Sequence, residues 1–117
     1  MRIRVRRVYD DPRSGEGYRV LVDRLWPRGV AKAALKHDEW NKAVAPSTEL
    51  RRWYGHDPGR WVEFSARYRL ELDDKPDVLE PLLTIARTGP LTLLYAARDT
   101  KHTHALVLKS YLEKRLK

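Results

Sequence analysis

Two short apolar segments constrain the fold of this 117-residue chain more than any other feature. Residues 18–23 are apolar on both faces from Val20 to Val22, and residues 91–97 are apolar throughout. Strands of this kind are typical of the centre of a parallel sheet. A long, helix-rich connection separates them, so a right-handed crossover between parallel strands is expected. We predict one compact α/β domain over residues 1–117, with a mostly parallel sheet of three to four strands flanked by helices.

The remaining segments predict one more strand and a series of helices. Residues 2–9 alternate at first, with Ile3 and Val5 on one face and arginines on the other, as expected of a half-exposed strand at a sheet edge. Proline, glycine and capping residues mark most of the helix ends. The predicted helices lie at residues 30–35, at residues 38–45, from the cap Ser47 to Gly55, from the cap Asp57 onwards, from the cap Asp77 to Gly89, and after Thr103.

The composition narrows the chemistry. The chain has no cysteine, which excludes thiolate nucleophiles, zinc–thiolate sites and iron–sulfur clusters. It has no apolar leader segment and no run of about 18 apolar residues, so a cytoplasmic protein that does not insert into a membrane is expected. The net charge of +8 favours an anionic partner: a nucleotide, a phosphorylated metabolite or nucleic acid. The alternative is a solvated basic surface with no specific partner.

The parallel arrangement decides where a site can lie. The carboxyl ends of neighbouring parallel strands meet at one edge of a sheet, so residues 23–28 are expected beside residues 98–104. The last helix begins at the same place, and its free backbone N–H groups add partial positive charge there. Together these features predict a pocket that binds a small anion.

Charged and aromatic residues in these segments are the candidate ligand-binding groups. Arg24, Arg28 and Arg98 can form a clamp that holds phosphate or carboxylate in bidentate fashion. Alternatively, at least one of the three points to solvent or pairs with a nearby carboxylate. Trp26 and Tyr95 can stack on the base or sugar ring of a ligand.

Two carboxylates and two histidines are the other candidates. Asp23 ends a central strand and can act as a general base, or it forms a structural ion pair with an arginine. The spacing of Asp99, His102 and His104 suits a divalent metal in an extended segment, but at the start of a helix the two rings diverge. We therefore expect no metal site. We expect Asp23, Asp99 and an inward His104 as catalytic candidates and His102 as a ligand-binding residue. No motif specifies a cofactor.

Several segments also resemble a known family. Residues 20–29 (VLVDRLWPRG), 45–51, 53–58, 93–99 and 102–105 are similar to those of the YeaO-like proteins, a branch of the bacterial domain of unknown function 488. The resemblance spans nearly the whole chain. It implies a small, single-domain cytoplasmic α/β protein whose signature residues lie at the predicted pocket. Because that family is uncharacterised, the resemblance implies no reaction.

The sequence leaves two functions open. The first is a ligand-binding domain or small enzyme, such as a hydrolase or transferase, that acts on a compact anion. The second is a nucleic-acid-binding or regulatory module that uses the basic strand formed by Arg2, Arg4, Arg6 and Arg7 and the basic tail at residues 113–117. We favour the first, because the charges concentrate at strand ends and no basic recognition helix is present. Ligand identity and oligomeric state stay open.

Overall fold

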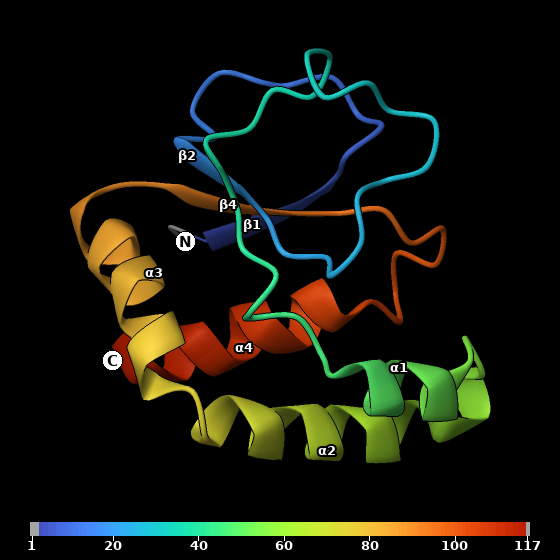
Figure 1. Ribbon diagram of the computed structural model, residues 1–117. Coiled ribbons are helices and arrows are strands. Elements are labelled where there is room, and N and C mark those ends of the chain that lie inside the picture. The colour runs from blue at the N-terminus through green and yellow to red at the C-terminus, as the bar shows by residue number, and fades with distance from the viewer. Residues whose placement is uncertain (1–2, 117) are drawn as a thin grey trace.

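A computed structural model describes residues 3–116, which fold around one four-stranded parallel sheet with the strand order β1-β4-β2-β3 (Figure 1). The strands are β1 (Ile3–Arg7), β2 (Tyr18–Leu21), β3 (Glu39–Trp40) and β4 (Leu91–Tyr95). The helices are α1 (Thr48–Tyr54), the short 3-10 helix η1 (Pro58–Arg60), α2 (Trp61–Asp73), α3 (Pro76–Thr88) and α4 (His104–Leu116). This architecture confirms the predicted α/β fold. No helix within residues 3–116 is long and apolar enough to cross a membrane.

The two apolar segments form the centre of the sheet, as predicted. β2 lies beside β4, with Val20 opposite Leu93 and Leu21 opposite Leu94, and all four side chains are fully buried. β1 pairs with β4 and occupies an edge, which confirms the interpretation of its arginine-rich face. The long connection between β2 and β4 carries helices, so these strands run parallel through a crossover.

The two faces of the sheet are covered differently. α2, α3 and α4 lie on one side of the sheet, and irregular segments before and after β2 cover the other (Figure 1). On the helical side, Val20, Val22 and Leu93 pack against the buried faces of the helices. On the opposite side, a smaller cluster forms around Leu21 and Leu94, with Trp26 and Trp40 packed against it. Successive residues of each central strand therefore supply both cores.

The helices predicted at residues 30–35 and 38–45 are wrong. Residues 30–38 form turns, and Glu39–Trp40 adds β3 to the sheet. The Asp38 N–H donates to the Arg19 carbonyl at 2.7 Å, and the Asn41 N–H donates to the Leu21 carbonyl at 2.8 Å. The backbone N–H groups of residues 38 and 41 therefore bond to carbonyls at the free edge of β2 and not within a helix. Local sequence patterns do not reveal this pairing.

Residues at the helix ends determine where α1 and α3 begin. The Ser47 hydroxyl accepts from the Leu50 N–H at the start of α1, and Gly55, with φ of 54°, ends that helix as predicted. The predicted cap at Asp77 is wrong by position. α3 begins one residue earlier, at Pro76, where the missing proline N–H costs nothing, and Asp77 lies in the first turn.

Candidate functional site

A pocket of about 630 Å³ lies where β1, β2 and β4 end. Its walls come from residues 23–28 after β2, residues 96–99 after β4, residues 102–104 at the start of α4, and α1 with the turn that follows it. The Ala96 N–H donates to Asp23 Oδ2 at 2.9 Å, which joins the two loops directly. The predicted convergence of these segments is therefore confirmed. The volume of the pocket falls in the range of sites for small molecules.

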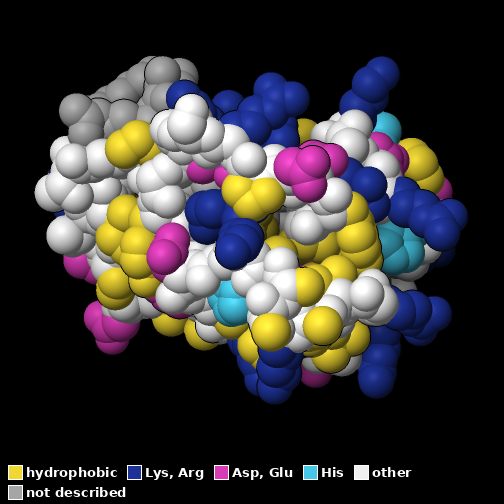
Figure 2. Space-filling model, turned by 90° about the horizontal axis from the view of Figure 1, so that it is seen from above, with side chains coloured by type: hydrophobic (Ala, Val, Ile, Leu, Met, Phe, Trp, Pro, Cys, Tyr) yellow, Lys and Arg dark blue, Asp and Glu magenta, His cyan; other side chains and the backbone are white. Residues whose placement is uncertain are grey.

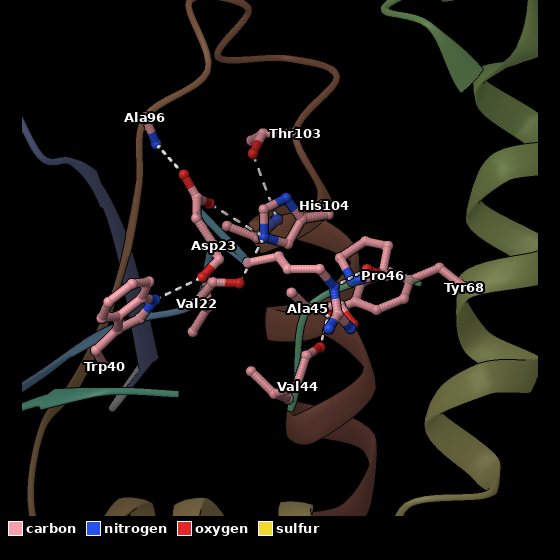
Figure 3. A network of polar contacts seen from close by, with 12 residues as sticks. Val22, Asp23, Trp40, Val44, Ala45, Pro46, Tyr68, Ala96, Thr103 and His104 are labelled. Carbon is pink, nitrogen blue, oxygen red and sulfur yellow. Dashed lines mark hydrogen bonds and ion pairs between the residues drawn. The ribbon is translucent and has the colours of Figure 1, made fainter. Parts of the chain in front are cut away.

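Asp23 and His104 form the floor of this pocket and face each other (Figure 3). His104 Nε2 lies 3.0 Å from the Val22 carbonyl oxygen and 3.4 Å from Asp23 Oδ1. A carbonyl oxygen only accepts, so this contact assigns the ring proton to Nε2. The Trp40 indole N–H donates to the Asp23 backbone carbonyl at 2.8 Å. Both floor residues are thus held by the sheet itself.

Burial shifts both floor residues toward their neutral forms. It raises the pKa of Asp23 above its ordinary value, against opposing effects of His104, the Ala96 N–H and Arg51. Burial also lowers the pKa of His104, against the opposing effect of Asp23. The predicted inward position of His104 is correct, whereas its role as an acid or base stays a prediction. Its Nε2 is already engaged with the protein backbone.

The guanidinium group of Arg24 is hydrogen-bonded to backbone carbonyls of the protein. Its Nε donates to the Pro46 carbonyl at 3.1 Å, and its Nη2 donates to the Ala45 carbonyl at 3.3 Å. The buried Tyr68 hydroxyl donates to the neighbouring Val44 carbonyl at 2.6 Å. Together these groups hold the chain segment that enters α1, which forms one wall of the pocket. Arg24 lines the pocket but spends two of its donor groups on this wall.

Three other arginines line the pocket with exposed head groups. Arg28 and Arg98 were predicted from the sequence, and Arg51 of α1 joins them. All three are exposed, and within residues 3–116 none of their guanidinium groups forms a hydrogen bond or ion pair with another side chain. Arg51 is nevertheless close enough to lower the pKa of Asp23. The predicted clamp of Arg24, Arg28 and Arg98 is therefore changed at one position, because Arg51 takes the place of Arg24.

Asp99 and His102 form a separate pair on the rim. The Asp99 Oδ2 lies 2.8 Å from His102 Nδ1, and its Oδ1 accepts from the Lys101 and His102 backbone N–H groups. The bond to His102 is the main reason that the pKa of Asp99 lies below its ordinary value. His104 contacts Val22 instead, so the imidazole rings at positions 102 and 104 diverge as expected. Asp99 shapes the loop between β4 and α4.

The two predicted stacking residues lie in different surroundings. Trp26 lines the pocket, yet its ring packs edge-on against Trp40 and His37, and its indole N–H donates to the Val30 carbonyl at 2.6 Å. Tyr95 is 3% exposed and belongs to the core between the sheet and the helices. It is not among the pocket-lining residues of the described chain.

Sequence reasoning missed several pocket residues. Tyr9, at the carboxyl end of β1, lines the pocket, and its hydroxyl donates to the Arg28 carbonyl at 3.0 Å. The same rule that located Asp23 could have found it, because β1 is parallel to its neighbour. Arg51, Tyr54 and His56 come from α1 and its end, whose approach to the strand ends depends on tertiary packing that no local pattern encodes.

Comparisons with known proteins place the chain among uncharacterised relatives. A family model described as the inactive DUF488-N3 subclade matches residues 2–117. The uncharacterised protein YeaO of Escherichia coli K12 is 46% identical over 112 residues, which cover 96% of this chain and 97% of the relative. The uncharacterised protein Rv3073c of Mycobacterium tuberculosis is 44% identical over 114 residues, with 97% and 96% covered. No solved structure matches at a significant level. The resemblance noted in the sequence is confirmed.

Proposed function

We propose that this chain, which belongs to the DUF488 family and to its subclade described as inactive, binds a small anionic ligand, such as a nucleotide or phosphorylated metabolite, without converting it. The proposed site is the pocket at the carboxyl ends of β1, β2 and β4. The cytoplasmic location expected from the sequence stays a prediction.

The observation that carries this proposal is the set of three arginines around one pocket whose guanidinium groups have no side-chain partner within residues 3–116. Arg28, Arg51 and Arg98 approach the pocket from three different segments, and their head groups are exposed. Guanidinium groups bind phosphate and carboxylate oxygens in pairs of parallel hydrogen bonds, so converging arginines favour an anion over a neutral ligand. α4 also begins at the pocket, and the positive end of its dipole acts in the same direction.

The state of the catalytic candidates supports binding rather than turnover. A general acid or base exchanges a proton with its substrate, whereas His104 Nε2 already faces the Val22 carbonyl. Asp99 is hydrogen-bonded to His102 and to its own loop. These contacts suit a rigid receptor. The hydrolase or transferase reading of the sequence therefore has less support than ligand binding.

Thermal unfolding with and without added anions tests the proposal. A ligand present at 100 times its Kd adds about 2.7 kcal/mol of stability. We expect an adenosine 5′-monophosphate or inorganic phosphate titration to raise the Tm of the wild-type protein and of Arg52→Ala, but not of Arg51→Ala. Arg52 is the matched control, because it is exposed, adjacent on α1 and absent from the pocket lining within the described chain. Equal Tm shifts for both variants, or no shift in the wild type, would refute the proposal.

The nucleic-acid alternative has less support. Arg6 pairs with Glu16 at 3.1 Å, and Arg7 donates to the Ala97 carbonyl and stacks on Tyr9. Arg2 lies outside the described residues. Figure 2 views the molecule of Figure 1 from above and shows Lys and Arg side chains in several separate groups, with acidic and apolar side chains between them. Nucleic-acid backbones are usually bound by a continuous basic surface.

A further inference from the structure

The pocket has a polarity that its total charge does not reveal. Its floor carries the Asp23 carboxylate, whose side chain is 17% exposed, beside the 16% exposed His104. Its rim carries the exposed guanidinium groups of Arg28 and Arg98. An anionic group pushed to the floor would approach the Asp23 carboxylate, whereas at the rim it meets the guanidinium groups, and the Asp99 carboxylate there is hydrogen-bonded to His102 and to its own loop. The anionic end of a ligand therefore belongs at the rim.

The floor offers hydrogen-bond acceptors to the inner end of the ligand. A carboxylate has roughly four lone-pair positions. Asp23 Oδ2 uses one on the Ala96 N–H and keeps a lone pair for a second donor, whereas Oδ1 is buried and lies 3.4 Å from His104 Nε2. The Nε2 proton of His104 is directed to the Val22 carbonyl, so the Asp23 carboxylate has fewer hydrogen bonds than it has in water. A largely buried carboxylate with few donors is costly, so a ligand group that donates a hydrogen bond is favoured here.

Apolar and aromatic side chains also line the pocket. Tyr9, Leu25, Pro46, Tyr54 and Phe64 all line the pocket. Tyr9 and Leu25 are 48% and 62% exposed, so both side chains are open to a bound ligand. Such walls suit the C–H faces of a carbon skeleton, which would extend from the acceptor at the floor to the cations at the rim.

From this polarity we infer that the ligand is a phosphomonoester of a hydroxylated carbon skeleton, the sugar phosphate or nucleotide class, bound with a hydroxyl group at Asp23 and its phosphate between Arg28, Arg51 and Arg98. The inference rests on the proposed function and adds the orientation and the class of the ligand. Inorganic phosphate satisfies the rim alone, and a free sugar satisfies the floor alone.

Calorimetric titration with three probes of graded chemistry tests this inference. Ribose 5-phosphate carries both groups, n-butyl phosphate carries the same anion without hydroxyls, and ribose carries hydroxyls without the anion. We expect the wild type to bind ribose 5-phosphate at least tenfold more tightly than n-butyl phosphate. Asp23→Asn should bring the two affinities within about threefold of each other, because the charged acceptor is lost. Asp74→Asn, an exposed change of the same kind at the far end of α2, should keep the wild-type ratio.

The outcomes separate the two proposals. Equal binding of ribose 5-phosphate and n-butyl phosphate overturns the inference but leaves anion binding intact. A wild-type preference that survives in Asp23→Asn also overturns it, because Asp23 is then not the acceptor. Binding of ribose as tight as that of ribose 5-phosphate, or binding of no phosphate ester at all, overturns the proposed function itself. If Asp23→Asn does not fold, the three affinities of the wild type still decide the case.

Discussion

Replacing Asp23 by alanine tests how strongly the pocket floor holds the two loops together. The carboxylate accepts a 2.9 Å hydrogen bond from the Ala96 N–H, and 17% of its side chain is exposed. A hydrogen bond to a charged group contributes about 1.5–3 kcal/mol, and its removal leaves a part-buried N–H without a partner. Burial of the carboxylate offsets part of that gain, because it also raises the pKa of Asp23. We expect a net loss of about 2 kcal/mol for Asp23→Ala.

Urea unfolding at pH 7 measures this loss against a matched variant. Asp23→Asn keeps a side-chain oxygen that can accept from Ala96, so we expect it to lose about 1 kcal/mol or less. The Trp40 hydrogen bond goes to the Asp23 backbone carbonyl and survives in both variants. The urea dependence of the free energy should stay unchanged, so that the midpoints alone report the difference. If the two variants unfold within 0.5 kcal/mol of each other, roughly the scale of neutral substitutions, the side-chain tie to Ala96 is not what stabilises the floor.

Two further predictions concern backbone conformation and pH. Gly17→Ala should destabilise the protein by about 3 kcal/mol, because its φ is 68° and a Cβ there would lie 2.2 Å from the Pro90 carbonyl oxygen. Gly29→Ala should cost only about 1 kcal/mol, because its φ is 78° but the space around it is open. Equal losses of Tm for the two variants would contradict this prediction. Stability should fall as the pH drops below about 6.5, because burial lowers the pKa of His104 and the unfolded chain then binds the proton more readily; the raised pKa of Asp23 opposes this at lower pH. His104→Gln should flatten the slope of unfolding free energy between pH 5 and 7, and a slope equal to that of the wild type would exclude His104 as its source.

The sequence determined the parts of the fold that depend on local pattern. Fully apolar segments identified β2 and β4 as central strands, and the rule for parallel strands predicted residues 23–28 beside residues 98–104, where Asp23 indeed meets His104. The sequence did not predict β3, because Glu39–Trp40 becomes a strand only by pairing with the free edge of β2 and by packing of Trp40 on Trp26. A two-residue strand has no periodicity to detect.

The candidate site divides in the same way. Asp23, Arg28, Arg98 and His104 all line the pocket, because they follow strand ends or begin a helix there. The sequence could not tell that Arg24 would be consumed by the carbonyls of residues 45 and 46, since that contact depends on how α1 is carried past β2. The fate of a charged side chain depends on the partners that tertiary structure supplies.

The same contacts that disfavour catalysis favour selective binding. Each polar group at the floor is fixed before any ligand arrives: Asp23 by Ala96 and Trp40, and His104 by Val22. A fixed acceptor loses little conformational entropy when a ligand binds, so its hydrogen bond discriminates strongly between ligands with and without a matching donor. The rim arginines are exposed and free to move, so they attract anions with less discrimination. We therefore expect the floor to set which ligand binds and the rim to set how tightly anions in general are held.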